Sequence, residues 1–165
     1  MAAKKTHDAK PTLELEAHAE KIRSELKVPQ QSDVFRVAVE AGYLTALADG
    51  VVDDAERATM IRAIEILSAG AVIEWETESL LEECAERAKK EGAPKRVEAA
   101  GGELATLGQA EAGLLFAALV AAASKGIDKK EAEVLKGVAA AAGLAGDRVK
   151  EIVKRANAIS KQAGG

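Results

Sequence analysis

The chain has 165 residues, of which 48% are hydrophobic, 30% are charged and only 2% are aromatic. That length suits one domain with its own core, and the hydrophobic content excludes a wholly disordered chain. Alanine is the commonest residue, and together with leucine, glutamate and lysine it favours helices, whereas strands favour aromatic and β-branched residues. The composition therefore predicts an all-α fold in which helix packs on helix.

The expected helices are separated by glycines, prolines and capping residues. In chain order they cover 12–27, about 33–48, 54–70, part of 73–91, a segment from 94 onward, 109–124, 129–142 and 147–161. A loose arm at 1–11 and a frayed tail at 162–165 are expected to flank this single domain, 12–161. The fifth helix is expected to bend or break at Gly101-Gly102, because glycine weakens a helix interior. The segment 109–124 is the most apolar and predicts a central, buried helix.

The net charge of −4 conceals an asymmetry along the chain. Residues 1–83 hold 17 acidic and 9 basic residues, which sum to −8, whereas residues 84–165 hold 10 and 14, which sum to +4. The excess is sharpest over 33–83, with 12 acidic residues against three arginines. Such a segment repels nucleic acid and attracts cations or basic protein surfaces. An ordinary solvated surface is the alternative interpretation.

Three features bear on the compartment. No apolar run approaches the roughly 18 residues that a membrane span needs. The N-terminal residues lack the apolar segment of a secretory signal. Cys84 is the single cysteine, so it forms no internal disulfide and suits a reducing environment. We therefore expect a cytoplasmic protein without direct membrane insertion.

Two helix–turn–helix corners repeat one pattern. The first reads Asp49-Gly50-Val51-Val52-Asp53-Asp54-Ala55-Glu56, and the second reads Lys125-Gly126-Ile127-Asp128-Lys129-Lys130-Glu131. The second has one residue fewer between its glycine and its glutamate. In both, glycine suits the left-handed end of a helix, and Asp-x-x-Glu resembles a capping box. The echo predicts two similar helical hairpins that pack about a pseudo-twofold axis.

At these corners the sequence resembles the tellurite-resistance TerB family. The matching residues are Tyr43 to Glu56 and Ala117 to Glu131, followed by Glu133-Val134-Leu135 and Ala139 to Leu144, within a similarity over about 33–157. The resemblance implies a TerB-like fold of about seven helices in a non-catalytic, cytoplasmic protein of tellurite resistance and wider stress responses. It also implies metal-linked sensing and assembly with membrane-bound TerC-like and calcium-binding TerD-like partners.

The first corner is a candidate site for a divalent cation, because calcium and magnesium need clustered hard oxygens. It is not an EF-hand, since Thr45 and Leu47 stand where that loop needs its first ligands. The candidate ligands are Asp49, Asp53, Asp54 and Glu56. Helix capping alone would explain Asp53 and Glu56, and both interpretations stay open. The second corner has Lys125 in place of Asp49, which argues against a second cation site.

The fourth helix carries a candidate partner-binding surface. Its glutamates repeat every four residues and form a like-charge row, namely Glu74, Glu78, Glu82 and Glu86. The row either receives a basic partner or is solvated. Trp75 is either an exposed interface anchor beside these glutamates or a residue packed on the core. Cys84 lies on the apolar face, where we expect a buried, inert thiol.

No catalytic constellation is recognisable in the sequence. The two histidines, His7 and His18, lie near the N-terminus far from Cys84, so neither a zinc site nor a metal-dependent hydrolase is expected. We therefore expect a binding or scaffold protein and no enzyme. It either holds a divalent cation at the first corner or, without metal, docks a basic protein partner through its acidic face. A membrane-associated stress complex is one such partner.

Overall fold

The computed structural model describes residues 32–67, 74–123 and 126–164. Its helices are α3 (Ser32–Ala46), the short 3-10 helix η2 (Leu47–Asp49), α4 (Asp54–Leu67), α5 (Glu74–Glu91), α6 (Ala93–Thr106), α7 (Ala110–Ala122), α8 (Lys129–Ala141) and α9 (Gly146–Gly164). These ranges contain no strand, so the predicted all-α fold is confirmed. The expected arm at 1–11 and the expected helix at 12–27 lie outside the described residues.

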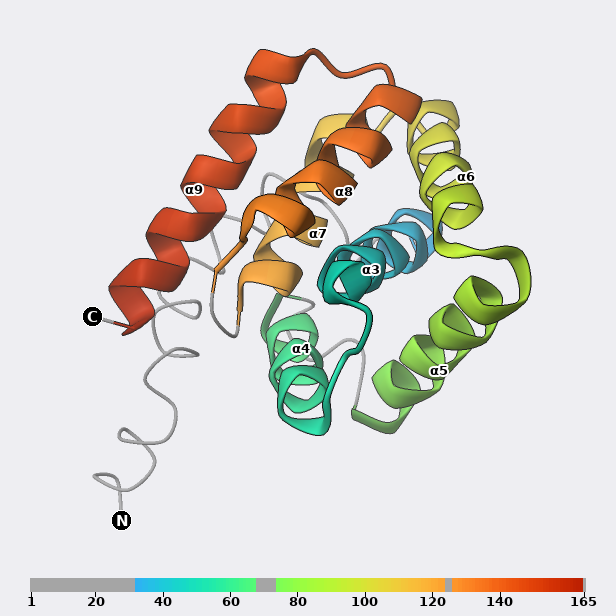
Figure 1. Cartoon of the computed structure of the whole chain (residues 1–165), viewed down its shortest axis with the longest axis vertical. Helices are drawn as coiled ribbons and strands as arrows, with labels where there is room; N and C mark the ends of the chain where they lie inside the picture. Colours follow the sequence, from blue (N-terminus) through green and yellow to red (C-terminus); the bar gives the residue numbers. More distant parts are fainter. Residues whose placement is uncertain (1–31, 68–73, 124–125, 165) are drawn as a thin grey trace.

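Helices α3 and α7 cross at the centre of the molecule (Figure 1). Small residues allow the crossing, because a Cβ on Gly42 would lie 3.2 Å from both the carbonyl oxygen of Ala117 and the Cβ of Val120. Every residue of α7 from Gly113 to Ala122 is buried. The prediction of a central, buried helix is therefore confirmed. The first helices of the two predicted hairpins are the pair that packs at the core.

Helix α6 continues through Gly101-Gly102, so the predicted bend or break there is wrong. A Cβ on Gly101 would clash with the carbonyl oxygen of Val138 and lie 2.5 Å from the Cβ of Ala141, both on α8. A Cβ on Gly102 would meet no atom within 4 Å. Gly101 is therefore the point at which α6 packs directly on α8, and this packing offsets the low helix propensity of glycine.

The outer helices occupy opposite sides of this core. Helix α5 packs on α3, α4 and α6, whereas α9 packs on α7 and α8 (Figure 1). Helix α9 extends to Gly164, three residues past the predicted end at Lys161. Among the helices of the described ranges, none combines the length and hydropathy required to cross a bilayer.

Candidate functional site

The first corner, residues 49–56, ends one helix and starts the next. Gly50 has a φ of 99°, a conformation that favours glycine, and its N–H donates to the carbonyl oxygen of Leu47 at 2.7 Å. The Asp53 carboxylate accepts a hydrogen bond of 2.7 Å from the Glu56 N–H, and the Glu56 carboxylate accepts one of 3.0 Å from the Asp53 N–H. The predicted capping box is confirmed, so both carboxylates stabilise the start of α4.

The candidate cation ligands of this corner do not come together as a set. The described residues contain no group of three or more histidine, cysteine, aspartate or glutamate side chains placed to hold a metal ion. Asp54 is exposed in the first turn of α4, and the side chain of Asp49 lies outside the described part of the structure. Capping accounts for Asp53 and Glu56. A divalent cation at this corner therefore stays a prediction.

The second corner, residues 126–131, has the same box in different surroundings. The Asp128 carboxylate accepts from the Glu131 N–H at 2.8 Å, and the Glu131 carboxylate accepts from the Asp128 N–H at 3.0 Å. Glu131 is 1% exposed. Asn157 of α9 also contacts this corner, because its Oδ1 accepts from the Ile127 N–H at 2.6 Å and its Nδ2 donates to the Ile127 carbonyl oxygen at 3.4 Å. Contacts with α9 and the burial of Glu131 therefore cover part of the second corner.

The additional residue of the first corner faces solvent. Val52 packs partly buried against the core, as Ile127 does at the second corner, which leaves Val51 without a counterpart. Val51 is 68% exposed, and no other large hydrophobic side chain among the described residues is exposed. A single exposed valine is ordinary on a protein surface. Its significance here is its position beside the acidic residues Asp53 and Asp54.

Helices α4 and α5 form an open groove of about 550 Å³ next to the first corner. Three acidic, two basic and two apolar side chains line it: Asp54, Glu65, Glu78, Arg57, Arg62, Ala58 and Ile61. Nη2 of Arg57 donates to the carbonyl oxygen of Glu78 at 3.3 Å and so connects α4 to α5. The groove brings Asp54, a predicted cation ligand, onto the same surface as Glu78, a predicted partner-binding residue.

The glutamate row of α5 continues from this groove over the outer side of the helix. Glu78 is half-buried, whereas Glu82 and Glu86 are exposed. Within the described residues neither Glu82 nor Glu86 forms an ion pair. The neighbouring Glu83 differs, since it pairs with Arg87 at 3.1 Å. The side chains of Glu74 and Trp75 lie outside the described part of the structure.

A buried glutamate is the main electrostatic feature that the sequence analysis missed. The Glu40 side chain is 4% exposed, and it accepts hydrogen bonds of 2.8 Å from both Nε and Nη2 of Arg96. These bonds raise the pKa of Arg96 above its ordinary value. Nη1 of Arg87 lies 3.7 Å from the same carboxylate, so the network connects α3 to α5 and α6. Its signal in the sequence is a glutamate that helical periodicity places between the buried positions Val37 and Leu44.

Cys84 is fully buried beneath the glutamate row. Burial, reinforced by the charge of Glu40, raises the pKa of its thiol to about 12. A thiol of that kind is protonated at neutral pH and unreactive. The predicted buried cysteine is confirmed, and it takes no part in the candidate site.

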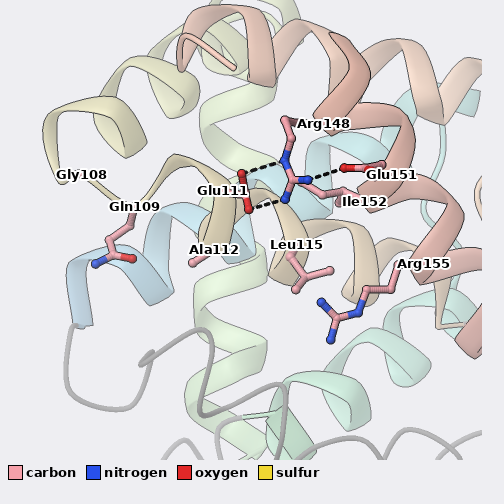
Figure 2. A pocket seen from close by; sticks show the side chains of 9 residues that line it. All are labelled: Gly108, Gln109, Glu111, Ala112, Leu115, Arg148, Glu151, Ile152 and Arg155. Atoms are coloured by element: carbon pink, nitrogen blue, oxygen red, sulfur yellow. Dashed lines mark hydrogen bonds and ion pairs between the residues drawn. The ribbon is translucent and has the colours of Figure 1, made fainter. Parts of the chain in front are cut away.

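A second open groove, of about 480 Å³, lies between the start of α7 and α9 (Figure 2). Three of its four charged side chains are paired with one another. The Glu111 carboxylate accepts from Nε and Nη2 of Arg148 at 3.0 and 2.5 Å, and Arg148 also contacts Glu151. Hydrogen bonding to Arg148 lowers the pKa of Glu111. Glu82 and Glu86 on α5 have no ion-pair partner among the described residues, which makes the first corner and the α4–α5 groove the stronger candidate site.

Comparison of the chain with protein-family models, with curated proteins and with solved structures gives no match. The resemblance to the TerB family, and the stress-related role that it implies, therefore stay predictions from the corner residues.

Proposed function

We propose that this protein is a non-catalytic assembly protein whose acidic face binds a basic segment of another protein. The acidic face consists of the first corner, the α4–α5 groove and the exposed glutamates Glu82 and Glu86. Helices α4 and α5 carry ten acidic and five basic residues, a net charge of −5. The observation that carries the proposal is the open groove that Asp54 and Glu78 both line, beside Glu82 and Glu86, which have no counter-ion among the described residues.

The chemistry of this face specifies its partner. Glu82 and Glu86, which have no ion-pair partner in the described part of the chain, favour lysine and arginine side chains. Complementary charge increases the association rate and the specificity of such a contact. Val51 and the apolar lining of the groove would contact aliphatic side chains of the same partner, and apolar anchors provide more of the affinity than exposed charges do. A lysine-rich amphipathic segment satisfies both requirements.

A cation-dependent form of this function has less support, because Asp53 and Glu56 already serve as caps. The cytoplasmic, stress-associated setting belongs to the proposal through the TerB resemblance alone. In that setting, a basic tail of a membrane-associated stress protein is a partner of the required chemistry. Calorimetric titration with calcium, magnesium and zinc separates the two forms, since the metal-free form predicts no binding heat.

The binding proposal is tested with a labelled amphipathic peptide of lysine and leucine, followed by fluorescence anisotropy. The double variant Glu78→Lys with Glu82→Lys is expected to lose about tenfold or more in affinity, and the affinity of the native chain is expected to fall steeply with salt. The matched control is Glu98→Lys with Glu133→Lys, which makes the same change in net charge at exposed positions on α6 and α8.

The control variant is expected to keep most of the native affinity, because its substitutions lie outside the acidic face. Equal losses in both double variants would show that net charge alone attracts the peptide. That result would overturn the proposed site.

A further inference from the structure

A basic surface, on helix α9, lies on the side of the molecule opposite helix α5 (Figure 1). Helix α9 carries five basic and two acidic residues, a net charge of +3, whereas α5 carries three basic and seven acidic residues, a net charge of −4. The two helices pack on different neighbours and occupy opposite sides of the core (Figure 1). The molecule therefore has two poles of opposite charge.

Helices α5 and α9 each carry two exposed charged residues spaced four residues apart. Glu82 and Glu86 lie one turn apart on α5, on the side opposite the buried Leu81. Lys150 and Lys154 lie one turn apart on α9, on the side opposite the buried Ala156. All four are exposed, and none of them forms an ion pair with another described residue. Two rows with the same repeat and opposite charge can pair between helices laid side by side.

The two helices also match in length. Helix α5 has 18 residues and α9 has 19, so each is about 27–29 Å long at a rise of 1.5 Å per residue. The two facing pairs of charges, Glu82 with Glu86 and Lys150 with Lys154, would lie within that length. The second row is present in the chain itself, so no other molecule is needed to supply the basic partner.

We infer that α5 of one copy binds α9 of a second copy, so that this chain associates with itself head to tail. The inference rests on the proposed function because it uses the same acidic face and names a second copy as the basic partner. The two surfaces differ and lie on opposite poles, so each bound pair keeps one unused α5 and one unused α9. Such heterologous contacts form rings or filaments.

The contact is expected to be reversible and sensitive to salt. Exposed ion pairs are individually weak, and added salt screens them. Sedimentation velocity of the full chain at low ionic strength is therefore expected to show species larger than the monomer, whose proportion increases with concentration. At high ionic strength the same samples are expected to sediment as monomers.

Charge reversal provides the decisive experiment. One variant carries Glu82→Lys with Glu86→Lys, and the other carries Lys150→Glu with Lys154→Glu. Each variant alone presents two surfaces of like charge and is expected to be monomeric. An equimolar mixture is expected to associate again, because each surface of one variant then meets its opposite on the other. Circular dichroism checks that both variants keep their helices.

Two results would overturn the inference: a native chain that remains monomeric up to about 1 mM at low salt, which corresponds to negligible affinity, or a mixture that remains monomeric while the native chain associates. The peptide assay distinguishes this failure from that of the proposed function. If the chain is monomeric but still binds the lysine-rich peptide, only the inference of self-association fails. If the chain is monomeric and binds no peptide, both the inference of self-association and the proposed function fail.

Discussion

The two corners of this protein share one local motif and differ in what surrounds it. Each begins a helix with a reciprocal Asp–Glu capping box. At the second corner Asn157 bonds to the backbone of Ile127 beside the box and the glutamate of the box is buried, whereas the first corner exposes Val51 and lies next to an open groove. The comparison teaches that the same motif can be covered by the rest of the protein at one corner and accessible to solvent at the other.

The helices that follow the two corners differ in the same way. Helix α8, after the second corner, packs on α3, α6, α7 and α9, whereas α4, after the first corner, packs on α5 and α7. Substitutions around α8 are therefore expected to change stability most. Those at the first corner are expected to change binding and to cost less stability than those around α8.

The largest effect is expected where α6 packs on α8. Gly101→Ala is expected to destabilise the protein by about 2–3 kcal/mol, because its methyl group overpacks the contact with Val138 and Ala141. Gly102→Ala, which faces open space, is expected to stabilise the protein by about 0.5–1 kcal/mol. Urea denaturation of both variants measures the difference. Similar changes in both would contradict the close packing of α8.

Substitution of the two capping glutamates compares their contributions to stability at the two corners directly. Glu131→Ala is expected to cost about 2 kcal/mol, because it removes the acceptor of the part-buried Asp128 N–H and empties the space of a side chain that is 1% exposed. Glu56→Ala is expected to cost about 1 kcal/mol or less, because water replaces the lost hydrogen bond at the first corner. Thermal unfolding of the two variants provides the test. Equal losses would mean that the two boxes do not differ in their contribution to stability.

Substitution of Asn157 tests whether its contact with Ile127 stabilises the second corner. Asn157→Ala is expected to cost about 1–1.5 kcal/mol, since the N–H and carbonyl groups of Ile127 lose their partner in a half-buried site. Asn157→Asp keeps an acceptor for the N–H and is expected to cost less. Hydrogen exchange at the Ile127 amide reports the contact itself. Unchanged exchange in Asn157→Ala would show that α9 does not close this corner.

The smallest effect on stability is expected at Val51. Val51→Ser is expected to change the free energy of unfolding by less than about 0.5 kcal/mol, as is usual for exposed positions. Ile127→Ser, at the second corner, is expected to cost about 1 kcal/mol through lost apolar burial. In the binding assay this order should reverse. Val51→Ser should lower the affinity for the lysine-rich peptide, and Ile127→Ser should leave that affinity unchanged.

Local signals in the sequence predicted the described α-helices and both capping boxes, because periodicity, glycines and Asp-x-x-Glu act over a few residues. The errors and omissions involve partners far along the chain. Gly101 requires its contact with α8, Glu40 meets an arginine 56 residues away, and Asn157 meets a corner 30 residues away. Candidate site residues were recognised by charge, but the groove that joins Asp54 and Glu78 depends on how α4 packs on α5.

The central claim is that the first corner is a binding surface and the second corner is not. Titration of the ¹⁵N-labelled protein with the lysine-rich peptide, followed by two-dimensional NMR, tests it residue by residue. The account predicts shift changes at the amides of Val51, Asp54 and Glu78, with those of Asp128 and Glu131 unchanged. Equal changes at both corners, or changes at the second corner alone, would contradict it.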